Sequence, residues 1–213
     1  MKEIFKQNRF FLNPYIILFS MLTVLVLIFS KSDTHLFINQ FHTAFFDFFF
    51  KNLTHFGDGI LIMIIAALFL FFSYRQGLMI VVTYAISGLL AQFFKKVVFS
   101  DFARPVKYFE GVAELNLVEG VKTLSRHSFP SGHSTTAFAF FFYLSVITKN
   151  PYLKTFWFCL ATLVGYSRVY LSHHFLQDVI FGSFLGVITT FILVLTLDRH
   201  LNIKALNRGL IKK

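Results

Sequence analysis

The stretch from Ser167 to Asp178 places an arginine, two histidines and a carboxylate between two strongly apolar segments. Ionisable groups in such a place are costly in a bilayer and commonly mark a functional site. If the segment after the histidines is helical, His174 and Asp178 share one face and lie about 6 Å apart along the axis. The carboxylate can then hold one ring nitrogen of His174 and leave the other free to react. His173 is the neighbouring alternative for this role.

A second polar group predicts an anion-binding site. Pro130, Ser131, Gly132 and His133 stand directly before another apolar run. Ser131 is a suitable N-cap with a glycine beside it, so the amides at the start of that helix are free to bind an anion. His133, which follows them, would face the same anion; the alternative is an interfacial histidine.

Three cations add to this expected site. Arg104 and Arg168 can each bind phosphate oxygens in bidentate fashion, and Lys96 can add a point charge. Together with the histidines they predict phosphoryl transfer by one nucleophile and one acid. The alternative for each arginine is a side chain that only reaches the membrane interface, and Lys95 is expected to contact a lipid headgroup.

The composition indicates one integral membrane domain over residues 1–213. Hydrophobic residues make up 56% of the chain and charged residues only 14%, which is unusual for a soluble protein. The apolar runs predict an all-α bundle of six transmembrane helices, at residues 15–30, 59–73, 78–99, 133–148, 155–171 and 175–197. Several runs are shorter than the roughly 20 residues of a span, so the helices should extend into their polar flanks.

Other segments are expected outside the hydrocarbon layer or at its edge. The first apolar run follows a basic start and is expected to be a retained helix rather than a cleaved signal peptide. Residues 45–50 are expected to form a short amphipathic piece at the interface. Residues 100–132 are expected to form an extramembrane loop that borders the site.

Six spans place both termini on one side of the membrane. That side holds 11 lysines and arginines, whereas the other holds nine, three of which are assigned to the site, and eight of the ten acids. The positive-inside rule therefore predicts cytoplasmic termini. The eleven are Lys2, Lys6, Arg9, Arg75, Lys149, Lys154, Arg199, Lys204, Arg208, Lys212 and Lys213. The net charge of +10 is attributed to this bias, and no basic and aromatic motif predicts a nucleic-acid partner.

This topology brings the unusual polar residues together. The end of the third span, the loop 100–132, the start of the fourth span, the end of the fifth and the start of the sixth all fall on the non-cytoplasmic face. The sequence therefore predicts an active site at the non-cytoplasmic membrane interface.

The three polar segments resemble the type 2 phosphatidic acid phosphatase superfamily, which includes bacterial lipid phosphatases, glucose-6-phosphatase and the vanadium haloperoxidases. The family signature is a lysine and an Arg-Pro pair, then Pro-Ser-Gly-His, then Ser-Arg followed by a histidine and an aspartate. Residues 130–133 match the second part in full. The third part is matched with the expected spacing by Ser167, Arg168, His174 and Asp178. In the first part, Lys96 is separated from Arg104 by seven residues where the commonest form has six, and the six-residue position is Val97.

The resemblance implies a role for each matched residue. His174 would attack phosphorus to give a phosphohistidine, Asp178 would orient it, and His133 would protonate the leaving alkoxide and later activate water. The equatorial oxygens would be held by Lys96, Arg104, Ser131, Gly132 and Arg168. No metal or other cofactor is expected, because these cations and N–H donors take its place.

The expected function is that of a metal-independent lipid phosphatase in the bacterial inner membrane, with its site facing the periplasm. A phosphate pocket at headgroup level suits a lipid phosphate monoester or pyrophosphate, such as undecaprenyl pyrophosphate, phosphatidylglycerophosphate or lipid A. Two alternatives stay open. One is a vanadate-dependent haloperoxidase, and the other is a non-catalytic membrane binding or transport protein with a phosphate pocket.

Overall fold

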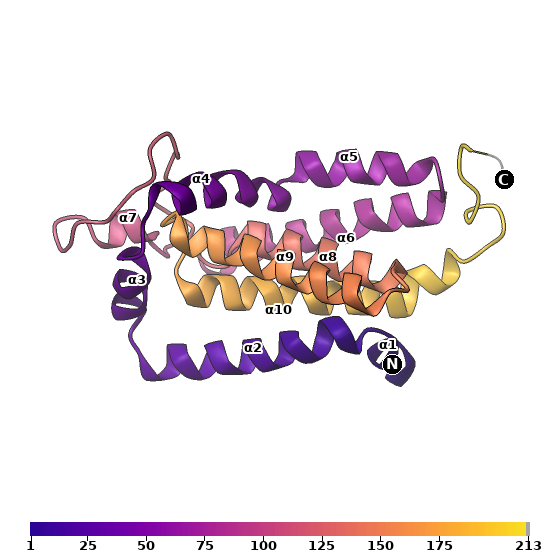
Figure 1. Cartoon of the computed structure of the whole chain (residues 1–213), viewed down its shortest axis with the longest axis horizontal. Coiled ribbons are helices and arrows are strands. Elements are labelled where there is room, and N and C mark those ends of the chain that lie inside the picture. The colour runs from indigo at the N-terminus through magenta and orange to yellow at the C-terminus, as the bar shows by residue number, and fades with distance from the viewer. Residues whose placement is uncertain (212–213) are drawn as a thin grey trace.

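The structure is a computed structural model that describes residues 1–211 (Figure 1). Lys212 and Lys213, which enter the count of basic residues, lie outside the described residues. Within residues 1–211 the regular structure consists of helices, with no strand, which confirms the predicted all-α class. The helices are α1 (Lys2–Gln7), α2 (Arg9–Ile28), α3 (Lys31–Asn39), α4 (Ala44–Leu53), α5 (Gly59–Leu70), α6 (Tyr74–Phe93), α7 (Pro105–Tyr108), α8 (Gly132–Ile147), α9 (Pro151–Tyr170) and α10 (Leu176–Leu193). Three tighter or wider turns extend them, namely the 3₁₀ turn η1 (Thr54–Gly57) and the π turns η2 (Phe94–Val98) and η3 (Val194–Asp198).

Helix α8 is the centre of the bundle and packs against α6, α9 and α10. Its residues 134–145 are all buried, and most of them are aromatic, alanine or small polar residues. A helix enclosed in this way can be apolar on every side without touching lipid. The core of the protein is therefore built around the helix that begins with the Pro-Ser-Gly-His segment.

Each of the six predicted apolar runs forms a helix. Among the described residues, α2, α6 with η2, and α10 with η3 are long and apolar enough to cross a membrane alone. A fourth span results if α4 with η1 and α5, which are bent by 54° relative to one another, are counted as one. Helix α8 has only 16 residues, and α9 includes Lys154 and Arg168. The count of six spans therefore stays a prediction.

Close contact between α8 and α10 positions the two motifs that these helices carry. A Cβ atom placed on Gly186 would lie 2.3 Å from the Thr135 carbonyl oxygen, and one placed on Gly182 would lie 2.6 Å from the Ser131 carbonyl oxygen. Only glycine allows so close an approach of the two helices. The Ser131 N–H also donates to the Asp178 carbonyl oxygen at 3.0 Å, which fixes the starts of α8 and α10 against each other.

Helices α3, α4 and α7 lie at the end of the bundle opposite the two termini (Figure 1). Helix α4 confirms the expected helical piece at residues 45–50, but α3 was not predicted. Its N-cap is Ser30, whose Oγ accepts the Asp33 N–H at 3.1 Å. The end of the molecule that carries α3, α4 and α7 is called the loop end below.

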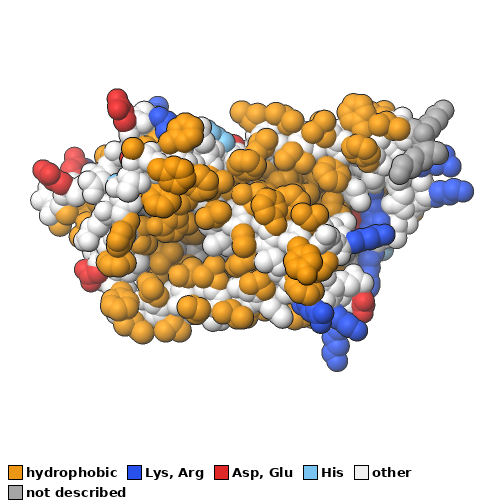
Figure 2. Space-filling model, viewed as in Figure 1, with side chains coloured by type: hydrophobic (Ala, Val, Ile, Leu, Met, Phe, Trp, Pro, Cys, Tyr) orange, Lys and Arg blue, Asp and Glu red, His pale blue; other side chains and the backbone are white. Residues whose placement is uncertain are grey.

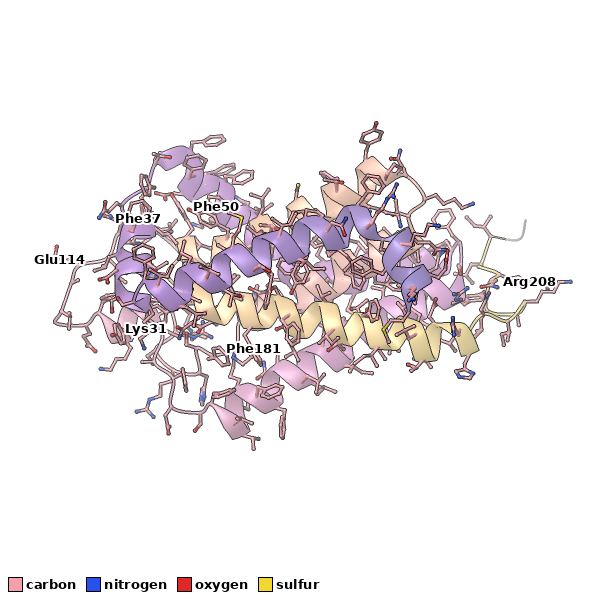
Figure 3. All side chains as sticks on the ribbon, turned by 90° about the horizontal axis from the view of Figure 1, so that it is seen from below. Lys31, Phe37, Phe50, Glu114, Phe181 and Arg208 are labelled. Carbon is pink, nitrogen blue, oxygen red and sulfur yellow. The ribbon has the colours of Figure 1, made fainter. Side chains whose placement is uncertain are left out.

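Charge is divided between the two ends. On the face shown in Figure 2, most lysines and arginines lie at the end with the termini, most acids lie at the loop end, and hydrophobic side chains cover the region between. Figure 3 marks the two ends with Glu114, on the loop after α7, and Arg208, near the C-terminus. A broad apolar belt between two charged ends is the surface expected of a protein that lies across a bilayer.

Candidate active site

The predicted segments meet in one cavity of about 880 Å³ at the loop end. It is bordered by helices α6, α8 and α9, by the η1 turn and by the loop 100–131. The polar side chains that line it include those of Lys95, Arg104, His133, Arg168, His173 and His174, and Gly132 also lines it. Four of the residues on which the prediction depends, Arg104, His133, Arg168 and His174, therefore share one cavity.

His174 stands beside Asp178 as the i, i+4 spacing predicts. The His174 Nδ1 atom is 3.5 Å from Asp178 Oδ2, slightly longer than an ordinary hydrogen bond, and both side chains are almost fully buried. Among the described residues Nδ1 has no hydrogen-bond partner. Such contacts are often long before a substrate binds. With Nδ1 turned to the carboxylate, Nε2 is the ring nitrogen left for reaction.

Asp178 is held in place by two other donors. The Ser128 hydroxyl donates to Asp178 Oδ2 at 2.5 Å, and the Phe175 N–H donates to the same oxygen at 3.0 Å. The second bond is the one that an acid in the first turn of a helix makes with its N-cap residue. The carboxylate is therefore fixed by both the loop 100–131 and the start of α10.

His174 is a neutral imidazole in this environment. Burial lowers its pKa well below the ordinary value of 6.5, and the positive charges of Arg104, Lys95 and Arg168 lower it further. A neutral ring keeps the lone pair that a nucleophile needs. The backbone N–H groups of His173 and His174 both donate to the Arg168 carbonyl oxygen, at 3.0 and 3.1 Å. These bonds attach the segment 171–175, between α9 and α10, to the end of α9.

The two arginines are buried beside the histidines. Arg104 Nη1 donates to the His173 carbonyl oxygen at 3.1 Å, and its Nε donates to the Arg126 carbonyl oxygen at 3.0 Å. Arg168 Nη1 donates to Thr54 Oγ1 of the η1 turn. Neither guanidinium reaches an acid within ion-pair distance among the described residues. Both are therefore placed to bind an anion in the cavity rather than to balance a protein carboxylate.

The lysine at the cavity is Lys95, and this corrects the placement expected for Lys96. Lys95 is 8% exposed, and its Nζ would lie 3.8 Å from a Cβ placed on Gly132. Lys96 is exposed and does not line the cavity. Both residues belong to the π turn η2, in which each residue turns the chain through a smaller angle than in an α-helix. Matching the family signature by its spacing from Arg104 gave Lys96, whereas the side chain that lines the cavity is that of Lys95.

Ser131 and Gly132 take different places at the start of α8. Ser131 is fully buried and is the N-cap, where its Oγ accepts the Ser134 N–H at 3.4 Å and the Ser134 hydroxyl at 2.8 Å. It does not line the cavity, whereas Gly132 does. The part of this helix start that faces the cavity is therefore the backbone from Gly132 onward, which is free to bind an anion there.

His133 has an acidic partner that was not expected from the sequence. Its Nε2 atom is 2.6 Å from Oδ1 of Asp58, the residue between η1 and α5. The available signal was an acid between two glycines, Gly57 and Gly59, directly before an apolar run. Within residues 1–211 no three His, Cys, Asp or Glu side chains gather in the way that metal ligands do, so no metal-holding set is assigned.

The chain is similar in sequence to proteins of one known family. The model of the PAP2 superfamily matches residues 76–201. The lipid A 4'-phosphatase of Porphyromonas gingivalis is 32% identical over 136 residues, which are 59% of this chain and 56% of that protein. The lipid A 1-phosphatase of the same organism is 33% identical over 64 residues, 29% of this chain and 14% of that protein. The chain thus spans about half the length, or less, of these curated relatives.

Two solved structures are similar over most of their length. The crystal structure of Aquifex aeolicus LpxE superposes with a TM-score of 0.67 and 25% identity, covering 75% of this chain and 92% of that one. The PAP2-type phosphatidylglycerolphosphate phosphatase of Bacillus subtilis superposes with a TM-score of 0.59 and 22% identity, covering 90% of this chain and 97% of that one. At 22% identity, the similarity to the Bacillus subtilis protein shows a shared fold only.

Proposed function

Because the chain belongs to the PAP2 superfamily, we propose that it is a membrane phosphatase that hydrolyses a lipid phosphate monoester or pyrophosphate through a phosphohistidine on His174. The observation that carries the proposal is the meeting of a neutral, buried histidine with Arg104, Arg168 and Lys95 in one cavity. A nucleophile facing a cluster of cations is the arrangement that phosphoryl transfer requires.

The cavity also suits a substrate whose tail stays in the membrane. Beyond the cations it is lined by Tyr84, Gly88 and Leu89 of α6, and Leu89 is 70% exposed on the apolar belt. A lipid can therefore place its phosphate among the cations while its chains remain beside α6. A soluble phosphate ester would leave this apolar part of the cavity unfilled.

The proposed reaction has two steps. His174 Nε2 forms a bond to phosphorus as the ester P–O bond breaks, and the leaving oxygen takes a proton from His133. Water then attacks the phosphohistidine, gives its proton to His133, and releases inorganic phosphate and neutral His174. Arg104, Arg168 and Lys95, with the amides from Gly132, stabilise the charge on the equatorial oxygens in both steps.

Lipid A is the substrate class that the named relatives favour, since two of them are lipid A phosphatases. We test this with purified protein in detergent and EDTA, measuring phosphate release from lipid A, phosphatidylglycerophosphate and undecaprenyl pyrophosphate. We expect turnover of lipid A to exceed that of the other two by at least about tenfold, and vanadate to inhibit it. Loss of turnover in EDTA would contradict the metal-independent mechanism. A preference for one of the other two lipids would contradict lipid A as the substrate.

We place the loop end of a six-helix bundle outside the cytoplasm, in the bacterial inner membrane, with both termini inside. The division of charge between the two ends supports this orientation (Figure 2). A periplasm-specific reporter fused after Phe109, directly before the exposed residues 110–112, should be active, and the same reporter fused after Arg208 should be inactive. The opposite pair of results would reverse the orientation.

A further inference from the structure

The Asp58 side chain contacts two histidines and makes no N-cap hydrogen bond to its own helix, α5. Its Oδ1 is 2.6 Å from His133 Nε2, and its Oδ2 is 2.6 Å from His55 Nδ1. Asp58 is the N-cap residue of α5, where an aspartate usually accepts an N–H of its own helix. Its side chain makes no such bond. Each carboxylate oxygen contacts an imidazole instead, and both histidines line the cavity.

Asp58 lies between two glycines that pack closely on neighbouring helices. A Cβ placed on Gly57 would lie 3.1 Å from the His133 carbonyl oxygen, and one placed on Gly59 would lie 2.0 Å from the Tyr84 hydroxyl oxygen. A side chain at residue 57 would press on the backbone of α8 at His133, and one at residue 59 would displace the Tyr84 hydroxyl, so both positions favour glycine.

The η1 turn before Asp58 is tied to two helices of the site. The Thr136 hydroxyl of α8 donates to the Gly57 carbonyl oxygen at 3.0 Å. At the other end of the turn, Arg168 of α9 donates to Thr54. The turn is thus anchored to the helix that carries His133 and to the helix that carries a phosphate-binding arginine. His55, whose side chain is 66% exposed, holds the outer oxygen of the carboxylate from the solvent side.

We propose that Asp58 is a positioning residue for His133, whose ring it orients for proton transfer to the leaving group. The inference rests on the proposed phosphatase function and adds a residue outside the family signature. Asp58 keeps a proton on His133 Nε2, so Nδ1 is the nitrogen that exchanges protons with the substrate. The site then contains two carboxylate–imidazole pairs, Asp178–His174 for attack and Asp58–His133 for proton transfer.

Each half of the reaction gives Asp58 a definite task. In the first step, protonated His133 gives the Nδ1 proton to the leaving alkoxide, while the Nε2 proton stays on the side of Asp58. In the second step, Nδ1 accepts a proton from the attacking water, and the carboxylate stabilises the imidazolium that forms. A carboxylate that holds a catalytic imidazole in one tautomer has this role in hydrolases of other folds.

The test compares Asp58→Asn and Asp58→Ser with wild type, using purified full-length protein in detergent and a lipid phosphate monoester. Serine is a good N-cap, so Asp58→Ser keeps the start of α5 while removing the charge. General acid–base catalysis is worth about 100- to 10,000-fold, and we expect both variants to lose at least 100-fold in kcat with KM within about threefold of wild type. Asp101→Asn, an exposed aspartate in the loop after η2, is the matched control and should keep full activity.

A second readout separates proton transfer from a structural role. An aryl phosphate releases a phenolate that needs no proton, so single-turnover release of the phenolate should change less than about threefold in Asp58→Asn. Hydrolysis of the phosphohistidine still needs His133 as a base, so phosphoenzyme should accumulate in this variant and not in wild type.

Three results would overturn the inference: unchanged kcat in both variants, a rise in KM without a fall in kcat, or equal losses for phenolate and alkoxide release. The proposed function has its own control in the same experiment. If wild type releases no phosphate, or if His174→Ala matches it, the phosphatase itself is wrong. If those two proteins behave as expected and the Asp58 variants do not, only the role of Asp58 is wrong.

Discussion

Replacing His174 with alanine should abolish phosphate release from the preferred lipid, with a loss of about 10⁴-fold or more. Removing the nucleophile of a covalent mechanism leaves only the residual catalysis that binding and charge stabilisation supply. The measurement is initial-rate phosphate release in detergent, together with trapping of an acid-labile, alkali-stable phosphoenzyme from labelled substrate. Wild type should form this phosphoenzyme, and His174→Ala should form none.

Two further variants make the His174 result specific. His200→Ala alters an exposed histidine at the opposite end of the bundle and should be as active as wild type. His173→Ala removes the neighbouring ring, whose backbone carbonyl, unlike its side chain, binds Arg104. It should retain phosphoenzyme formation. A labelled phosphoenzyme in His174→Ala that disappears in His173→Ala would transfer the nucleophile to His173.

Lys95→Ala should lower kcat/KM by roughly 100-fold or more, because it removes a buried positive charge from the place where the phosphoryl oxygens gather charge. The loss should appear mainly in kcat, since the contact strengthens as the transition state forms. Vanadate should also inhibit the variant more weakly than wild type. Steady-state kinetics with the preferred lipid and a vanadate titration provide both measurements.

Lys96→Ala is the matched control, since it removes the same side chain from the next position in the same π turn. Lys96 is exposed, so this variant should stay within about twofold of wild type. A large loss in Lys96→Ala and none in Lys95→Ala would restore the pairing expected from motif spacing. It would also mean that η2 winds differently when the substrate is bound.

Much of the architecture could be predicted because it depends on strong local patterns. Long apolar runs predict helices, and a helix at 176–193 puts His174 and Asp178 side by side. The convergence of Arg104, His133 and Arg168 follows from counting spans. Helix α3 was missed because its polar and aromatic composition carries no clear period. Its start depends on the local cap at Ser30, which is a weak signal in sequence.

The details of the site were harder to predict because they depend on contacts between distant segments. Lys95 and Lys96 have the same chemistry, and the sequence alone does not show which of the two reaches the cavity. Asp58 lies 75 positions before His133, and nothing local links them. Ser131 illustrates a different limit: its motif position is correct, but its hydroxyl is used inside the protein as a cap. A motif can therefore locate a residue at the site without showing which of its atoms are available to bind a ligand.

The backbone N–H groups of His173 and His174 both donate to the carbonyl oxygen of Arg168, at the end of α9. The backbone of the proposed nucleophile, His174, is therefore tied to that of Arg168, one of the proposed phosphate-binding residues. A change in membrane thickness that tilts α9 should consequently move Arg168 and His174 in the same direction.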